Sequence, residues 1–170
     1  MNSIGTFAFF NCTSLTSITI PEGVTSIENS VFASCSSLPS ITIPDSVTSI
    51  GNFTFYNCAS LTSITLPENL TSIGEEAFDE CANLGNVIFQ GPAPTVGNDA
   101  FAGLPTSASA IVKAGNLRLL GICFWREGFE AAFGPDRMGE KGGGGRGGTG
   151  LKIPTAGLGK KSVELFSLGD

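Results

Sequence analysis

Hydrophobic and polar residues alternate in short stretches that recur every 23 residues over about residues 3–104. Residues 15–20 read LTSITI, in which isoleucine alternates with serine and threonine. This period of two is typical of a strand that buries one face and leaves the other in solvent. Pro21 follows and ends the strand, because proline has no backbone N–H to donate. The pattern therefore predicts one main strand in each 23-residue unit.

Further columns of like residues repeat at the same interval. They are Cys12, Cys35, Cys58 and Cys81; Phe9, Phe32, Phe55, Phe78 and Phe101; Ile18, Ile41, Ile64 and Val87; and Ile20, Ile43, Leu66 and Phe89. Val24 and Ile27 bracket two polar residues and indicate a second short extended piece, and the small side chains within 28–35 favour one or two helical turns. Each unit is thus predicted to contain a strand, a turn, a second short strand and a helical turn.

A single unit cannot fold alone, because its seven apolar side chains bury too little surface to offset the entropy lost by ordering 23 residues. Stacked units would place each strand about 4.8 Å from the next and pair their backbones. Each apolar column would then become a continuous ladder. The sequence therefore predicts a repeat solenoid that is stabilised by contacts between neighbouring units.

The repeated unit resembles that of BspA-like, or treponemal-type, leucine-rich repeat proteins, which reads CxxLxxIxLPxxLxxIgxxAFxxC. Residues 12–35, 35–58 and 58–81 follow this unit nearly position for position. The resemblance implies a right-handed superhelix of β and 3₁₀ segments with one main parallel strand per unit. It also implies adhesion or protein recognition rather than catalysis, at the cell surface or after secretion. No ligand-contact residues are shared widely enough in that family to transfer to this chain.

The repeat register weakens towards residue 112, where Gln90 replaces a proline and Leu104 replaces a cysteine. The solenoid is therefore assigned to residues 1–112, with four main strands and a fifth edge strand expected over 108–112. Residues 113–138 are expected to form a short helix or cap, and 139–170 a Gly-rich, mostly irregular flexible tail. The fingerprint Gly145-x-Gly147-x-x-Gly150 lies in this tail without the strand that a dinucleotide site requires.

The charged residues are split in the same way as the repeat. Residues 1–112 contain nine carboxylates and neither lysine nor arginine, whereas 113–170 contain six carboxylates and all nine basic side chains. An acidic solenoid is not expected to bind nucleic acid, which requires basic side chains against phosphates. The longest apolar stretch, 119–125, is too short to insert into a membrane. The chain also contains no histidine, which excludes histidine-based triads and metal sites.

The polar positions of the main strands are the candidate interaction face, because they should point out of the sheet at regular spacing. They are Ser17, Thr19, Ser40, Thr42, Ser63, Thr65 and Asn86. Two other interpretations remain open. Serine and threonine are ordinary residues on a solvated strand face, and a flat threonine array can also order water or ice.

The cysteine column is predicted to consist of buried, reduced packing thiols, because metal sites normally use closely spaced cysteine pairs. Cys123 lies outside the register and is the cysteine expected to be reactive. No metal, cofactor or catalytic residue is predicted, since the acidic residues Glu22, Asp45 and Glu68 are spread one per repeat in turns.

The favoured function is a non-catalytic protein–protein interaction or cell-surface adhesion module, with a host or matrix protein as one suitable partner. The alternative is a structural spacer in a larger surface or protist protein, with no ligand of its own. Ser3-Ile4-Gly5 already corresponds to Ser26-Ile27-Glu28, so the chain starts within a unit and lacks a signal peptide; a fragment or an intracellular protein is expected on this basis. An uncapped end would favour end-to-end self-association.

Overall fold

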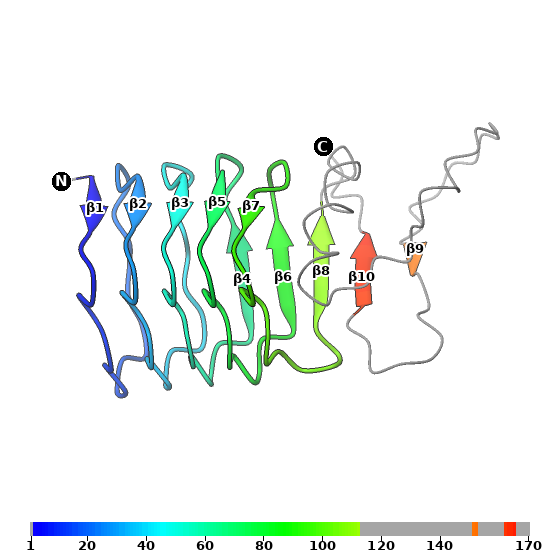
Figure 1. Ribbon diagram of the computed structural model, residues 1–170, viewed down its shortest axis with the longest axis horizontal. Coiled ribbons are helices and arrows are strands. Elements are labelled where there is room, and N and C mark those ends of the chain that lie inside the picture. The colour runs from blue at the N-terminus through cyan, green and yellow to red at the C-terminus, as the bar shows by residue number, and fades with distance from the viewer. Residues whose placement is uncertain (1, 113–150, 153–161, 166–170) are drawn as a thin grey trace.

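The computed structural model describes residues 2–112, 151–152 and 162–165. Successive coils of the chain lie side by side along the long axis of the molecule (Figure 1). We number the coils by the inward phenylalanine that each contains, from coil 1 with Phe9 to coil 5 with Phe101. The architecture is a parallel-strand solenoid of about five coils, so the predicted fold class is confirmed.

The second short extended piece of each unit forms the first sheet. Its strands are β1 (Ser3–Ile4), β2 (Ser26–Ile27), β3 (Ser49–Ile50), β5 (Ser72–Ile73) and β7 (Thr95–Val96), in that spatial order. Each strand pairs in parallel with its equivalent in the next coil, for example Ile27 with Ile50. In β2, β3 and β5, isoleucine is buried in the core and serine is half-buried.

The main strands form the second sheet, but only from coil 3 onwards. Its strands are β4 (Ser63–Leu66), β6 (Asn86–Phe89), β8 (Ser109–Val112), β10 (Ser162–Leu165) and β9 (Leu151–Lys152), in that spatial order. Residues 40–43 contribute only the bridge between Thr42 and Thr65, and 17–20 form no strand. Pro39 explains the difference, because the amides of Thr62 and Gly85 at the equivalent position bond to the preceding coil. Pro39 has no such N–H.

The helical turns expected in each unit are not formed in the part of the chain that the structure describes. The backbone amides of alternate residues instead reach the next coil, as in Phe32 N to Thr54 O (2.9 Å) and Ser34 N to Tyr56 O (2.8 Å). These amides are therefore unavailable for bonds within a helix. The turn segment also places two residues per coil at positive φ, for example Ser30 at 55° and Ser34 at 61°.

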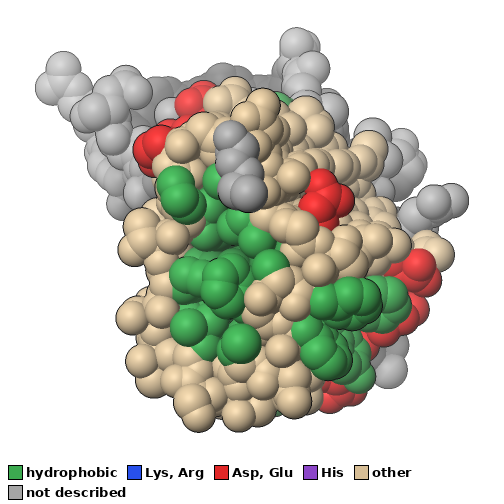
Figure 2. Space-filling view, turned by 90° about the vertical axis from the view of Figure 1, so that its left-hand side faces the viewer, with side chains coloured by type: hydrophobic (Ala, Val, Ile, Leu, Met, Phe, Trp, Pro, Cys, Tyr) green, Lys and Arg blue, Asp and Glu red, His purple; other side chains and the backbone are tan. Residues whose placement is uncertain are grey.

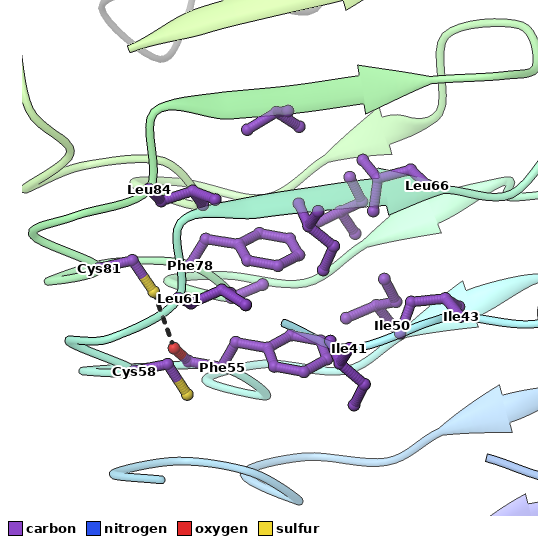
Figure 3. Packing of buried hydrophobic residues seen from close by; sticks show 14 of the residues in the cluster. Ile41, Ile43, Ile50, Phe55, Cys58, Leu61, Leu66, Phe78, Cys81 and Leu84 are labelled. Atoms are coloured by element: carbon purple, nitrogen blue, oxygen red, sulfur yellow. Dashed lines mark hydrogen bonds between the residues drawn. The ribbon is translucent and has the colours of Figure 1, made fainter. Parts of the chain in front are cut away.

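The core consists of ladders that run through all coils. The inward phenylalanines stack with ring centroids 5.2–5.4 Å apart, from Phe9 to Phe101. Leucine and isoleucine columns from both sheets close around them (Figure 3). Parallel stacking of identical rings requires each coil to repeat the previous one, which is why the 23-residue period is so regular.

Two short strands lie in the range where an irregular tail was expected. β10 pairs in parallel with β8 and extends the second sheet, and β9 pairs antiparallel with β10. β8 itself occupies the place of the expected edge strand. The expected helix or cap over 113–138, the glycine fingerprint and the rest of the tail lie outside the described residues.

Candidate functional site

The predicted interaction residues all lie on the outer side of the main-strand segments. In β4, Ser63 and Thr65 are half-buried and point outward, whereas Ile64 and Leu66 are each only 1% exposed. The remaining members, Ser17, Thr19, Ser40, Thr42 and Asn86, are exposed. The alternation along the strand therefore places these side chains as expected, while their role in binding stays a prediction.

The sheet register brings equivalent residues of this face into rows. Ser63 is paired with Asn86, and Thr65 with Thr42 on one side and Ile88 on the other. Neighbouring side chains in a row are therefore about 4.8 Å apart. The threonine row becomes apolar at Ile88, so the hydroxyl-bearing part of the face belongs to coils 1–3.

The hydroxyls of this face make no hydrogen bond with the described part of the chain. Within residues 2–112, the side chains of Thr42, Ser63 and Thr65 make no hydrogen bond. A second threonine column beside the first sheet behaves differently. There Thr48 Oγ1 donates to Thr25 O (3.1 Å) and Thr71 Oγ1 donates to Thr48 O (2.8 Å). The column of Thr42 and Thr65 can thus offer hydrogen-bond donors and acceptors to a partner. The hydroxyls of Thr48 and Thr71 are already bonded to the preceding coil.

The buried cysteines form a ladder with the carbonyl groups of the preceding coil. Cys58 Sγ donates to Phe32 O (3.2 Å) and Cys81 Sγ donates to Phe55 O (3.1 Å; Figure 3). Burial raises the pKa of the Cys58 thiol, and it raises the pKa of Cys81 to about 12. These thiols stay protonated and unreactive at neutral pH.

Cys12 departs from the predicted buried column. It is exposed, whereas Cys35, Cys58 and Cys81 are buried. The reason is its place in coil 1, which no other described coil covers on that side (Figure 1). Cys123 lies outside the described residues.

The three turn carboxylates that the sequence singled out, Glu22, Asp45 and Glu68, are all exposed. They belong to one column, one residue per coil, and so do not converge on a common site. No group of three or more Cys, Asp or Glu side chains that could hold a metal ion occurs among the described residues.

Sequence reasoning missed a group of aromatic residues on the turn segment. Phe7 and Phe10 are 58% and 51% exposed, and Phe53 and Tyr56 occupy the same two positions in coil 3. The signal was present in the sequence, since each pair flanks the inward phenylalanine column. It was hidden because the same positions hold small or acidic residues in the other coils.

The parallel strands, the 23-residue coil and the stacked core columns define a leucine-rich-repeat solenoid. A family model described as BspA type leucine rich repeat region (6 copies) matches residues 1–126, and the chain belongs to this family. The predicted resemblance is thereby confirmed. A comparison with curated protein sequences finds no match.

Three solved structures are similar to this chain. A leucine-rich repeat protein of T. pallidum shares 31% identity over 60% of this chain, with a TM-score of 0.54; the chain spans 58% of its length. A leucine-rich repeat protein of Bacteroides ovatus shares 21% identity, covering 68% of this chain and 48% of that one, with a TM-score of 0.42. A leucine-rich cell surface protein of Faecalibacterium prausnitzii shares 25%, covering 52% and 33%, with a TM-score of 0.32.

Leucine-rich repeat proteins of this kind are generally protein-interaction or adhesion modules, are generally not enzymes and are typically associated with the cell surface. In the residues described, no helix has the length and apolarity needed to cross a membrane.

Proposed function

We propose that this solenoid is a non-catalytic adhesion or protein-interaction module. It binds a protein partner through the Ser/Thr face, which consists of the outward main-strand residues of coils 1–3: Ser17, Thr19, Ser40, Thr42, Ser63 and Thr65. The observation that carries the proposal is the row of outward hydroxyls that make no hydrogen bond within the solenoid. A hydroxyl is both donor and acceptor, so such a row can bond the backbone or the polar side chains of a partner.

The rigidity of the core supports this role. The residues directly behind the face, such as Ile64 and Leu66, are almost completely buried in the stacked ladders. In coil 3, Ser63 and Thr65 are held on a strand of the packed sheet and lose little further freedom on binding, which favours affinity. The absence of charge on Ser63, Thr65 and Asn86 favours a partner surface rich in polar, uncharged groups.

The surface location that is typical of the family supports a host or matrix protein as partner, with the chain exposed at the cell surface or secreted. A second copy of the chain is a further proposed partner. Coil 1 leaves Ile4, Phe9, Leu15 and Ile18 only half-buried, and Figure 2 shows hydrophobic side chains gathered on this end of the molecule. Light scattering over a range of concentrations would detect association through this end.

The experiment compares binding of two triple variants to a panel of matrix proteins and cells. The test variant carries Thr19→Lys, Thr42→Lys and Thr65→Lys, which places three large charges on the face. The control carries Thr25→Lys, Thr48→Lys and Thr71→Lys, which changes the charge equally at three exposed threonines beside the other sheet. It also removes their hydroxyl hydrogen bonds to the preceding coil, so its folding has to be verified first. Circular dichroism and thermal unfolding establish that both variants are folded.

We expect the parent chain and the control to bind at least one panel member and the test variant to lose that binding. Equal binding by the two variants would place the contact elsewhere on the molecule. If the parent chain binds no panel member, the alternative function is favoured, a structural spacer within a larger protein. That alternative is supported by the coverage of only 58% of the T. pallidum protein.

A further inference from the structure

The turn segments of successive coils form a second outward surface, separate from the Ser/Thr face. Two columns of this surface flank the inward phenylalanines. The first contains Phe7, Ser30, Phe53, Glu76 and Asp99, and the second contains Phe10, Ala33, Tyr56, Asp79 and Ala102. Backbone bonds hold them in register: Phe7 N to Asn29 O (3.2 Å), Ser30 N to Asn52 O (2.9 Å) and Phe53 N to Glu75 O (2.8 Å). We call these ten residues the turn strip.

The character of the turn strip changes along the solenoid. Coil 1 presents Phe7 and Phe10, whose rings meet edge to face with centroids 5.5 Å apart. Coil 3 presents Phe53 and Tyr56 in a similar arrangement at 6.1 Å. The two aromatic pairs are two coils, or about 10 Å, apart. The coil 1 pair is exposed, whereas Phe53 and Tyr56 are half-buried. Aromatic side chains that remain partly in solvent are common at interaction sites.

Coil 2 carries only small side chains between these pairs. Ser30 and Ala33 stand at the positions of the aromatic residues and are 8% and 3% exposed. The fold therefore accepts small residues at both positions. The repeat therefore does not require rings at these positions in every coil, and the rings of coil 1 are left largely in solvent.

Coils 4 and 5 carry carboxylates on and beside the same strip. They are Glu75, Glu76, Asp79, Glu80 and Asp99. Partial burial of Glu76, together with the charges of Asp79, Glu75 and Asp99, raises the pKa of its carboxyl group. Residues 1–112 contain no lysine or arginine to offset this repulsion. Figure 2 shows hydrophobic and acidic side chains side by side at the edge of the coil 1 end.

We propose that the turn strip binds a polypeptide segment that carries arginine or lysine together with apolar side chains. The apolar side chains pack on the aromatic pairs of coils 1 and 3. The cations lie over the rings and reach the carboxylates of coils 4 and 5, where they relieve the repulsion between them. Arginine suits this surface best, because its planar guanidinium group both stacks on aromatic rings and pairs with carboxylates. The strip is thus a second recognition surface with a chemistry different from that of the Ser/Thr face.

The probes are three twelve-residue peptides that lack tryptophan, with repeating Arg-Leu, Glu-Leu and Arg-Ser sequences. Each is titrated into the full chain by calorimetry at low and moderate salt. We expect the Arg-Leu peptide to bind, the Arg-Ser peptide to bind more weakly and the Glu-Leu peptide not to bind. Binding of the Arg-Leu peptide should weaken with added salt, because the paired charges are exposed to solvent.

Two variants use residues that the chain itself places in coil 2. Phe53→Ser with Tyr56→Ala removes the coil 3 aromatic pair, and Glu76→Ser with Asp79→Ala removes two carboxylates. We expect each to reduce affinity for the Arg-Leu peptide about tenfold, and the second also to reduce the salt dependence. Thr42→Ala with Thr65→Ala on the Ser/Thr face is the matched control and should bind as the parent chain does.

Three outcomes would overturn the proposal. The first is that the Arg-Leu peptide fails to bind the parent chain. The second is that it binds the aromatic variant and the carboxylate variant as tightly as it binds the parent. The third is that the Glu-Leu peptide binds the parent chain as well as the Arg-Leu peptide does. A dimer that the aromatic variant dissolves would assign the strip to self-association instead. Because the Ser/Thr face is intact in both strip variants, their panel binding separates failure of this proposal from failure of the proposed function.

Discussion

The inward and outward columns of the turn segment lie two residues apart and follow opposite rules. Phenylalanine occupies the inward position in all five coils, whereas the outward position changes from coil to coil. That outward column contains Phe7, Ser30, Phe53, Glu76 and Asp99, with φ between 49° and 60° throughout. The backbone is therefore the same in each coil while the outward side chain varies. Stacking thus fixes the side chains that meet their own equivalents in the core, and leaves those of the other column free to vary in type.

The largest effect should follow from truncating the inward column. Phe55→Ala removes a ring that is fully buried and stacked 5.3 Å from Phe32 and 5.2 Å from Phe78. We expect a loss of about 3–5 kcal/mol in the free energy of unfolding, measured with a chemical denaturant. The matched change Phe53→Ala, on the outward column of the same coil, should lose about 1 kcal/mol or less. Similar losses for the two variants would break the distinction between the columns.

A backbone contact between coils should give the next largest effect. A Cβ at Gly74 would overlap the backbone N and the side-chain oxygen of Asn52, whose Oδ1 accepts a hydrogen bond from Glu75 N (3.0 Å). We expect Gly74→Ala to destabilise the fold by about 1–3 kcal/mol. Gly5 occupies the same column in coil 1, and a Cβ there meets nothing within 4 Å. Gly5→Ala should therefore leave the unfolding midpoint nearly unchanged, and a comparable shift would contradict this account.

The buried cysteine column gives a pH-dependent test of the difference between inward and outward positions. Because burial raises the pKa of Cys81 from 9.0 to about 12, folding favours the protonated thiol. Its contribution to stability is fully present below pH 9 and is lost as the pH rises towards 12. At pH 8, iodoacetamide followed by mass spectrometry should label Cys12 but not Cys58 or Cys81 in the folded chain. Labelling of all these cysteines without denaturant would show that the coils open.

The smallest effect should come from the second positive-φ column. Glu80 has φ of 58°, and the equivalent residue in coil 5 is Gly103. Glu80→Gly relieves the left-handed strain and removes one carboxylate from a crowded acidic surface, against the entropy cost of glycine. We expect a stabilisation of about 0.5 kcal/mol, seen as a small rise in melting temperature. A fall would mean that Glu80 contributes a favourable interaction.

The period of the sequence predicted the coil, the two extended pieces and the outward direction of the Ser/Thr face. The alternation of apolar and polar residues indicates that Ile64 faces the core and Thr65 faces outward. The left-handed turn could not be predicted in this way, because residues such as Ser30 and Glu76 rarely adopt positive φ and stacking alone imposes it. The missing ladder at Pro39 depends on one absent amide. The turn strip escaped notice because a search for identical columns passes over positions that vary.

The inter-coil bonds of the turn segment share one direction, whereas those beside the first sheet, such as Thr48 N to Thr25 O, run the opposite way. Phe9, Phe32, Phe55 and Phe78 each donate their amide to the following coil, and no amide of these four residues points to the preceding one. Peptide dipoles aligned in this way add up, as they do in a helix, with the positive end towards coil 5. The aromatic pairs lie towards the negative end, whereas the carboxylates lie towards the positive end. Within this wall, the acidic groups therefore lie near the positive end of the aligned peptide dipoles, where their charge is best tolerated.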